Sequence, residues 1–125
     1  MLVFHDISEC RIGDVHKLAN RYLNVDESKV VLDQTESLHS IGKKIYSLWQ
    51  HVEDSDTDAG ILAKDADYLE CAVTACEYRA QGFDQAQEWL ETIKKRLQTK
   101  SAKQLFEQLC IMEPHSWWYG LKTFE

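Results

Sequence analysis

The chain carries a dense group of metal-binding side-chain types close to its beginning. His5 and Asp6 are adjacent, and the carboxylates Glu9 and Asp14 follow a short distance later. An imidazole beside a carboxylate is a ligand pair that suits Mn, Fe, Co, Ni, Zn or Mg. Further carboxylates nearby can act as general acid or base toward a metal-bound water. These residues therefore form a candidate metal centre, and the alternative is a helix-end histidine beside a solvated aspartate.

A second acidic motif begins at Lys64 and includes Asp65, Asp67 and Glu70. On a helix that turns 100° per residue, Asp65 and Asp67 lie about 200° apart, so they cannot both face one site. Asp65 falls near the apolar side of the helix and Asp67 faces elsewhere. Periodicity does not choose between them as a functional residue. The alternative is a charged helix start in which Lys64 and Glu70 form surface ion pairs.

The acidic loop that contains Asp54, Asp56 and Asp58 resembles the start of an EF-hand calcium loop. The glycine that this loop needs at its sixth position is replaced by Ala59. Its twelfth position holds Asp65 instead of a bidentate glutamate. We therefore expect a solvated loop whose last residues cap the following helix, and calcium binding is a remote alternative.

Composition restricts the class of protein. The 125 residues predict one domain, and a net charge of −7 argues against binding to a nucleic-acid polymer, which needs a basic surface. The apolar runs are too short for a signal peptide or a membrane span. None of the four cysteines forms a C-x-x-C pair, so we expect reduced, mostly buried thiols in a cytoplasmic protein.

The pattern of apolar residues predicts an all-α fold. Residues 1–9 read as the last turns of a buried helix that Gly13 ends, and residues 15–23 carry apolar side chains at helical spacing. Asp26 is a plausible N-cap for the next helix. A bend is expected at 39–42, before apolar residues resume the helical period.

The second half of the chain predicts three further helices. One spans about 58–81 and is closed by Gly82. Asp84 is expected to cap the next helix, and Thr99 or Ser101 the last one. The aromatic residues 117–119 are expected to fold back on the core.

Taken together, the two acidic motifs resemble those of the HD-domain superfamily of metal-dependent phosphohydrolases, and most closely its 5′-deoxynucleotidase-like branch. That branch reads His-Asp-x-x-Glu-x-x-x-Gly-Asp after a buried helix, as residues 5–14 do here. It then reads Lys-x-x-Asp-x-Leu-Glu on a later helix, as residues 64–70 do. The resemblance spans nearly the whole chain.

The resemblance implies a role for each matching residue. His5, Asp6 and Asp67 are implied as ligands of a divalent metal, which could be Mn, Co, Mg, Fe, Ni or Zn. Glu9 and Asp14 are implied to orient the attacking water and to handle protons. The implied substrate is a small phosphorylated molecule, most plausibly a nucleoside monophosphate, with no nucleic-acid polymer and no membrane as partner.

The start of the chain departs from the family pattern. A metal-binding histidine and a phosphate-binding arginine are expected upstream of the His-Asp helix, but only four residues precede His5. We therefore expect residues 1–125 to form a single partial HD domain that is N-terminally truncated. Weak metal binding, low turnover and homo-oligomer formation around Met1–Phe4 would follow, because missing helices expose apolar surface. The alternative function is a catalytically silent helical interaction module.

Overall fold

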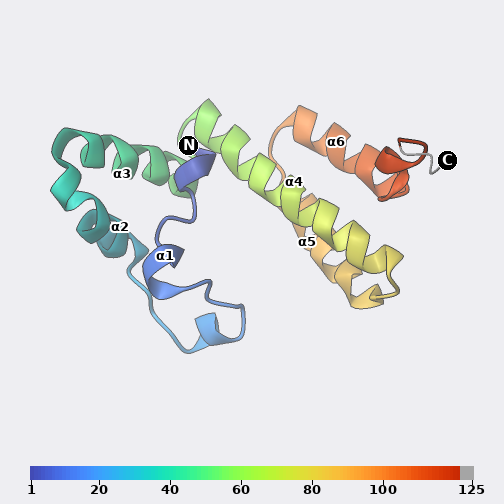
Figure 1. Cartoon of the computed structure of the whole chain (residues 1–125), viewed down its shortest axis with the longest axis horizontal. Coiled ribbons are helices and arrows are strands. Elements are labelled where there is room, and N and C mark those ends of the chain that lie inside the picture. Colours follow the sequence, from blue (N-terminus) through green and yellow to red (C-terminus); the bar gives the residue numbers. More distant parts are fainter. Residues whose placement is uncertain (122–125) are drawn as a thin grey trace. The chain divides into compact units, whose positions relative to one another are not determined.

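A computed structural model describes residues 1–121 of the chain, and all regular structure within them is helical (Figure 1). The chain divides into two compact units, Met1–Ala63 and Lys64–Glu125, which are described separately below. No strand occurs in the described residues. The expected all-α fold is therefore confirmed.

The first unit is built around two helices that pack against each other, α2 and α3. Asp26 caps α2 as expected, because its side chain accepts a hydrogen bond from the Lys29 backbone N–H at 3.0 Å. The buried apolar side chains of the unit include Val31 of α2 and Trp49 and Val52 of α3. The helical segments of this unit are η1 (Leu2–Phe4), α1 (Glu9–Ile12), η2 (Ala19–Arg21), α2 (Glu27–Thr35), η3 (Glu36–Leu38), α3 (His39–Asp54) and the start of α4 (Asp58–Ala80).

The corner between α2 and α3 depends on a close backbone approach. A Cβ atom at Gly42 would overlap the backbone carbonyl oxygen of Thr35, so glycine is required where the two helices meet. The bend that was expected at 39–42 lies at His39, which has a φ of 50°, and the following residues already belong to α3. The prediction placed the bend correctly but made it too long.

The N-terminal segment differs from the buried helix that the sequence predicted. Residues 1–8 form successive i→i+3 turns, such as His5 N–H to the Leu2 carbonyl, and α-helix begins only at Glu9. Val3 is 88% exposed. So short a segment gains too little packing to offset the cost of starting an α-helix. The exposed apolar side chains agree with the expected association around Met1–Phe4, which stays a prediction.

Residues 15–23 also fail to form the expected helix. Only the single turn η2 is regular there, and Tyr22 is 81% exposed. The apolar residues had the spacing of a helical face, but that face has little to pack against within the unit. By contrast, α1 ends at Gly13 as expected, and this residue has a φ of 75° that favours glycine.

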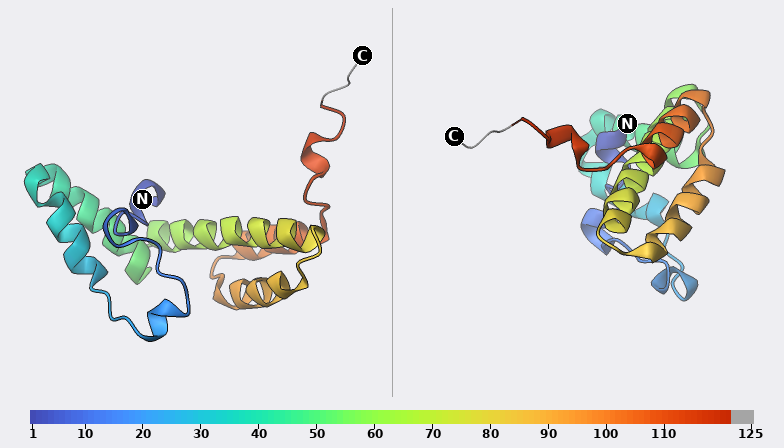
Figure 2. Two further views of the ribbon diagram at one scale, coloured as in Figure 1. Left: turned by 60° about the horizontal axis from the view of Figure 1, so that its bottom comes forward. Right: turned by 90° about the vertical axis from the view of Figure 1, so that its right-hand side faces the viewer.

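In the second unit, α5 and α6 lie beside α4 (Figure 2). Their buried apolar side chains form one cluster, which includes Ala72 of α4, Leu90 of α5 and Phe106 of α6. The expected bounds of α4 are confirmed, and Gly82 follows it with a φ of 92°. The remaining segments are η4 (Asp84–Ala86), α5 (Gln87–Arg96), α6 (Lys100–Ile111) and η5 (Ser116–Trp118).

Two helix caps were predicted for this unit, and one prediction is confirmed while the other is wrong. The Thr99 side chain caps α6 by accepting from the Ala102 backbone N–H. Asp84 was expected to cap α5, the helix that follows it. It lies instead inside the turn η4, which has no side-chain cap hydrogen bond. Phe83 is the N-cap of η4, and Ala86 is the N-cap of α5, also without a side-chain cap hydrogen bond.

Two further expectations for exposed groups are corrected. The aromatic residues 117–119 do not fold back on a core, because Trp117 is 70% exposed and its two neighbours are also exposed. The cysteines are not mostly buried, since Cys10 and Cys110 are exposed and Cys71 is half-buried, whereas Cys76 is buried. None of the helices in residues 1–121 combines the length and the apolar character that a bilayer span needs.

Candidate metal centre

His5 and Asp6 form a close pair directly after η1. The His5 Nε2 atom lies 2.8 Å from Oδ2 of Asp6, and His5 Nδ1 lies 2.6 Å from the carbonyl oxygen of Leu2. A carbonyl oxygen can only accept a hydrogen bond, so Nδ1 carries a hydrogen and donates it. Because a carboxylate only accepts, the contact with Asp6 needs a hydrogen on Nε2, and a bound metal would take the place of that hydrogen.

This arrangement fits part of a divalent metal site. Metal-binding histidines usually donate their second ring N–H to a carbonyl or carboxylate, which fixes the nitrogen that binds the metal. His5 meets this condition through Leu2. Adjacent donors that each lie ~2.1 Å from a metal in an octahedral site are ~3.0 Å apart, which is close to the 2.8 Å between Nε2 and Oδ2 here. His5 and Asp6 therefore supply two suitable donors.

Helix α2 holds the segment that carries this pair. The Ser8 side chain is buried and donates to Oε2 of Glu27 at 3.0 Å. At the penultimate residue of α2, the Gln34 amide nitrogen donates to the backbone carbonyl of Ile7 at 3.0 Å. These two hydrogen bonds fix a segment that has little regular structure of its own. They position the residues that directly follow Asp6.

Glu9 lies in a strongly negative environment. Glu9 is exposed, but partial desolvation of its carboxyl group is still the largest cause of its raised pKa. The negative charges of Asp6, Asp14 and Glu27 raise the pKa further, and only His5 lowers it. The structure thus brings four of the five predicted site residues into one electrostatic neighbourhood, and Glu9 holds its proton to a higher pH than an ordinary glutamate.

Asp65 and Asp67 have different surroundings on α4. Asp65 is only 2% exposed, and its carboxylate accepts hydrogen bonds from the backbone N–H groups of Gln98 and Thr99 and from the Thr99 hydroxyl, at 2.7 to 2.9 Å. Asp67 lies nearer the surface, with its Oδ2 atom 3.6 Å from Nζ of Lys64. Asp65 therefore has a structural role. Asp67 belongs to the second unit, so its place in a ligand set with His5 and Asp6 stays a prediction.

Within residues 1–121, no three His, Cys, Asp or Glu side chains are grouped so that they could hold a metal ion. This holds both for the acidic loop Asp54–Asp58 and for the residues around His5, so His5 and Asp6 are a partial ligand set by themselves. Asp56 instead accepts a hydrogen bond from Nδ1 of His51 at 2.7 Å.

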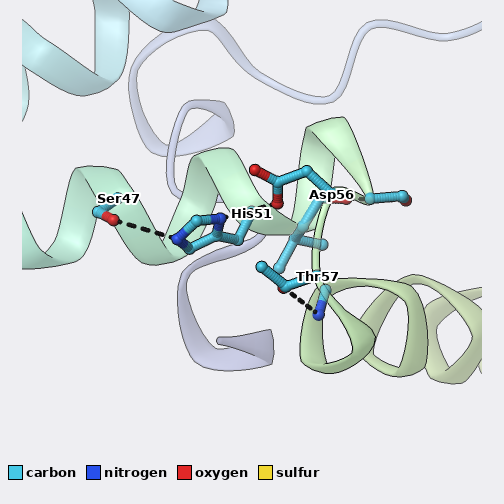
Figure 3. Close-up of polar contacts among 7 residues, drawn as sticks. Ser47, His51, Asp56 and Thr57 are labelled. Atoms are coloured by element: carbon cyan, nitrogen blue, oxygen red, sulfur yellow. Dashed lines mark hydrogen bonds and ion pairs between the residues drawn. The ribbon is translucent and has the colours of Figure 1, made fainter.

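This contact belongs to a polar network that sequence reasoning missed (Figure 3). His51 Nε2 lies 3.4 Å from the hydroxyl of Ser47, one helical turn earlier. The spacing of Ser47 and His51 could have indicated their contact, because residues four apart share a helix face. The contact with Asp56 runs across the end of α3 and has no such signal.

Residues 1–109 match the family model described as HD domain. A relative from Dictyostelium discoideum, 5′-deoxynucleotidase HDDC2, is 33% identical over 85 residues. This match covers 65% of the present chain and 45% of the relative, so it spans less than half of that protein's length. No solved structure matches the chain significantly.

Proposed function

Because the chain belongs to the HD domain family, we propose that it is a metal-dependent phosphohydrolase that acts on a phosphomonoester. A nucleoside 5′-monophosphate is the substrate class that the similarity to a protein named 5′-deoxynucleotidase supports. The observation that carries the proposal is the geometry of His5. Its Nδ1 is committed to the Leu2 carbonyl, and its Nε2 lies 2.8 Å from the Asp6 carboxylate.

His5, Asp6 and Asp67 would hold the metal in this proposal. When bound, a divalent metal lowers the pKa of its water and neutralises charge on phosphate oxygens. Its positive charge matters here because Glu9, Asp14 and the rest of the acidic neighbourhood would otherwise repel a phosphate. The acidic surroundings therefore agree with a site that needs a cation.

Glu9 and Asp14 would handle protons. The raised pKa of Glu9 means that its carboxyl group can hold a proton for longer as the pH rises, which is the property that a general acid needs. The neighbouring charge of Asp14 contributes to that shift. Asp14 follows Gly13, whose φ of 75° turns the chain at the end of α1.

The test is a measurement of metal affinity and of hydrolysis. Isothermal titration with Mn²⁺ and a panel of ribo- and deoxyribonucleoside 5′-monophosphates would be run on the chain, on His5→Ala and on His16→Ala. His16 is the matched control, since it is exposed and its ring only accepts from the Ala19 backbone N–H. We expect His5→Ala to lose at least about tenfold in metal affinity, together with any phosphatase activity.

Equal metal affinity in His5→Ala and in the unchanged chain would contradict the assignment of His5. A chain that binds no divalent metal and hydrolyses no phosphomonoester would contradict the proposal itself. The silent helical interaction module would then be the better description.

A further inference from the structure

We propose that Ser47 is a reactive nucleophile that accepts acyl groups from activated carboxylic esters, with His51 as its base and Asp56 as the residue that orients the base. Ser47 and His51 lie on α3, and Asp56 lies in the loop that follows (Figure 3). The His51 ring connects the other two through its separate nitrogens. This activity is independent of the proposed metal-dependent hydrolysis.

Hydrogen bonding fixes the tautomer of His51. An ionised carboxylate only accepts, so the 2.7 Å contact between Nδ1 and Asp56 Oδ1 places a hydrogen on Nδ1. In the neutral ring, Nε2 then has its lone pair toward the Ser47 hydroxyl, 3.4 Å away. Nucleophile, base and orienting carboxylate thus stand in the order that activates a serine. The nucleophile-to-base contact is at the long end, as is common before a substrate binds.

The loop that carries Asp56 is held on both sides. Ser55 adopts a left-handed conformation with a φ of 48°, which turns the chain back at the end of α3. On the other side, the Thr57 hydroxyl accepts from the Gly60 backbone N–H at 3.0 Å and so caps α4. Asp56 therefore reaches back to His51 from a fixed backbone.

The site is open to a small reagent. Ser47 is exposed, and the side chains of His51 and Asp56 are 37% and 48% exposed. In the reaction, the Ser47 oxygen attacks the ester carbonyl carbon while its proton passes to His51 Nε2. The ester C–O bond breaks, and the alkoxide leaves with the electron pair and takes up that proton. Water later hydrolyses the acyl-serine, which releases the carboxylic acid and restores the Ser47 hydroxyl.

The experiment uses p-nitrophenyl acetate as the probe, with EDTA present so that metal-dependent hydrolysis does not contribute. Release of p-nitrophenolate is followed by absorbance, and acetylated residues are located by peptide mass spectrometry. Ser40 is an internal control, because it is an exposed serine in the same helix, and within residues 1–121 no histidine–carboxylate pair contacts its hydroxyl. We expect Ser47 to be acetylated at least tenfold faster than Ser40.

The variants distinguish activation of the Ser47 hydroxyl by His51 and Asp56 from simple exposure of that hydroxyl to the reagent. Ser47→Ala should abolish the fast phase, Asp56→Asn should slow it at least tenfold, and Ser40→Ala should leave it unchanged. Circular dichroism checks that each exposed-site variant folds. Equal acetylation of Ser40 and Ser47 would overturn the proposal, as would a fast phase that persists in Ser47→Ala, because the imidazole alone would then account for the reaction.

Discussion

The buried carboxylate of Asp65 connects α4 to the start of α6, and its removal has a calculable cost. Asp65 accepts from the backbone N–H groups of Gln98 and Thr99 and from the Thr99 hydroxyl, all within 2.9 Å. Thr99 is also the N-cap residue of α6. Asp65→Ala therefore removes the contacts that fix the segment between α5 and α6.

The expected loss in the free energy of unfolding of Asp65→Ala is the balance of two opposing contributions. Each hydrogen bond to a charged acceptor is worth about 1.5 kcal/mol at the low end of the usual range, so three give about 4–5 kcal/mol. Part of this loss is offset, because the variant no longer has to desolvate a carboxylate on folding. We expect a net loss of about 3 kcal/mol in the free energy of unfolding. That loss corresponds to a Tm lower by on the order of 10 °C.

Urea denaturation followed by circular dichroism measures this loss, with Asp67→Ala as the matched control on the same helix. Asp67 is nearer the surface and pairs with Lys64 at 3.6 Å, so its variant should lose less than about 1 kcal/mol. The reasoning would be refuted if Asp65→Ala were as stable as Asp67→Ala. It would also be refuted if Asp65→Ala stayed within about 1 kcal/mol of the unchanged chain.

Three further predictions concern a titrating group, a thiol and a glycine. Glu9→Gln should be more stable than the unchanged chain at pH 7, because the raised pKa of Glu9 means that folding disfavours its charged form. Cys76 should react with iodoacetamide more slowly than Cys10, because burial raises the pKa of the Cys76 thiol whereas Cys10 is exposed. Gly42→Ala should cost about 2–3 kcal/mol in urea denaturation, since its Cβ would overlap the Thr35 carbonyl oxygen.

Specific results or control variants test each of these three predictions. Stability should fall as pH rises from the ordinary glutamate value of 4.5 through the raised pKa of Glu9, so the gain in Glu9→Gln should vanish below pH 4.5. A gain that persists at low pH would contradict the electrostatic cause. Equal alkylation of Cys76 and Cys10 would contradict the burial of Cys76. Gly82→Ala is the control for Gly42, because a Cβ there meets no atom within 4 Å and costs only backbone strain.

Helices in the second half of the chain were predictable because their signals agree with one another. The long apolar period of α4 ends at Gly82, and Thr99 offers a capping hydroxyl directly before α6. Residues 15–23 had an apolar period without an N-cap or a partner face, and they form only one short turn. Periodicity predicts a helix only where another element can cover the apolar face.

The candidate site was predictable to the extent that its residues are close in sequence. His5 and Asp6 are adjacent, and Glu9 lies near enough to feel the charge of Asp6. The hydrogen bond from Gln34 to Ile7, which helps to hold this segment, joins residues 27 positions apart. Local pattern carries no information on such a contact. The contact of His51 with Asp56 was missed for the same reason, because no local sequence pattern indicates it.

The motif Lys64–Asp67 shows how stability and function can be divided within one helical turn. Two aspartates about 200° apart cannot serve one site, and the structure assigns the buried one, Asp65, to backbone contacts. Asp67 makes none of those backbone contacts, and its proposed role as a metal ligand can therefore be tested separately from the role of Asp65. The two residues should therefore separate by assay. Asp65→Ala should lose stability and Asp67→Ala should lose metal affinity. If a folded Asp65→Asn variant loses metal affinity, the backbone contacts of Asp65 also position Asp67.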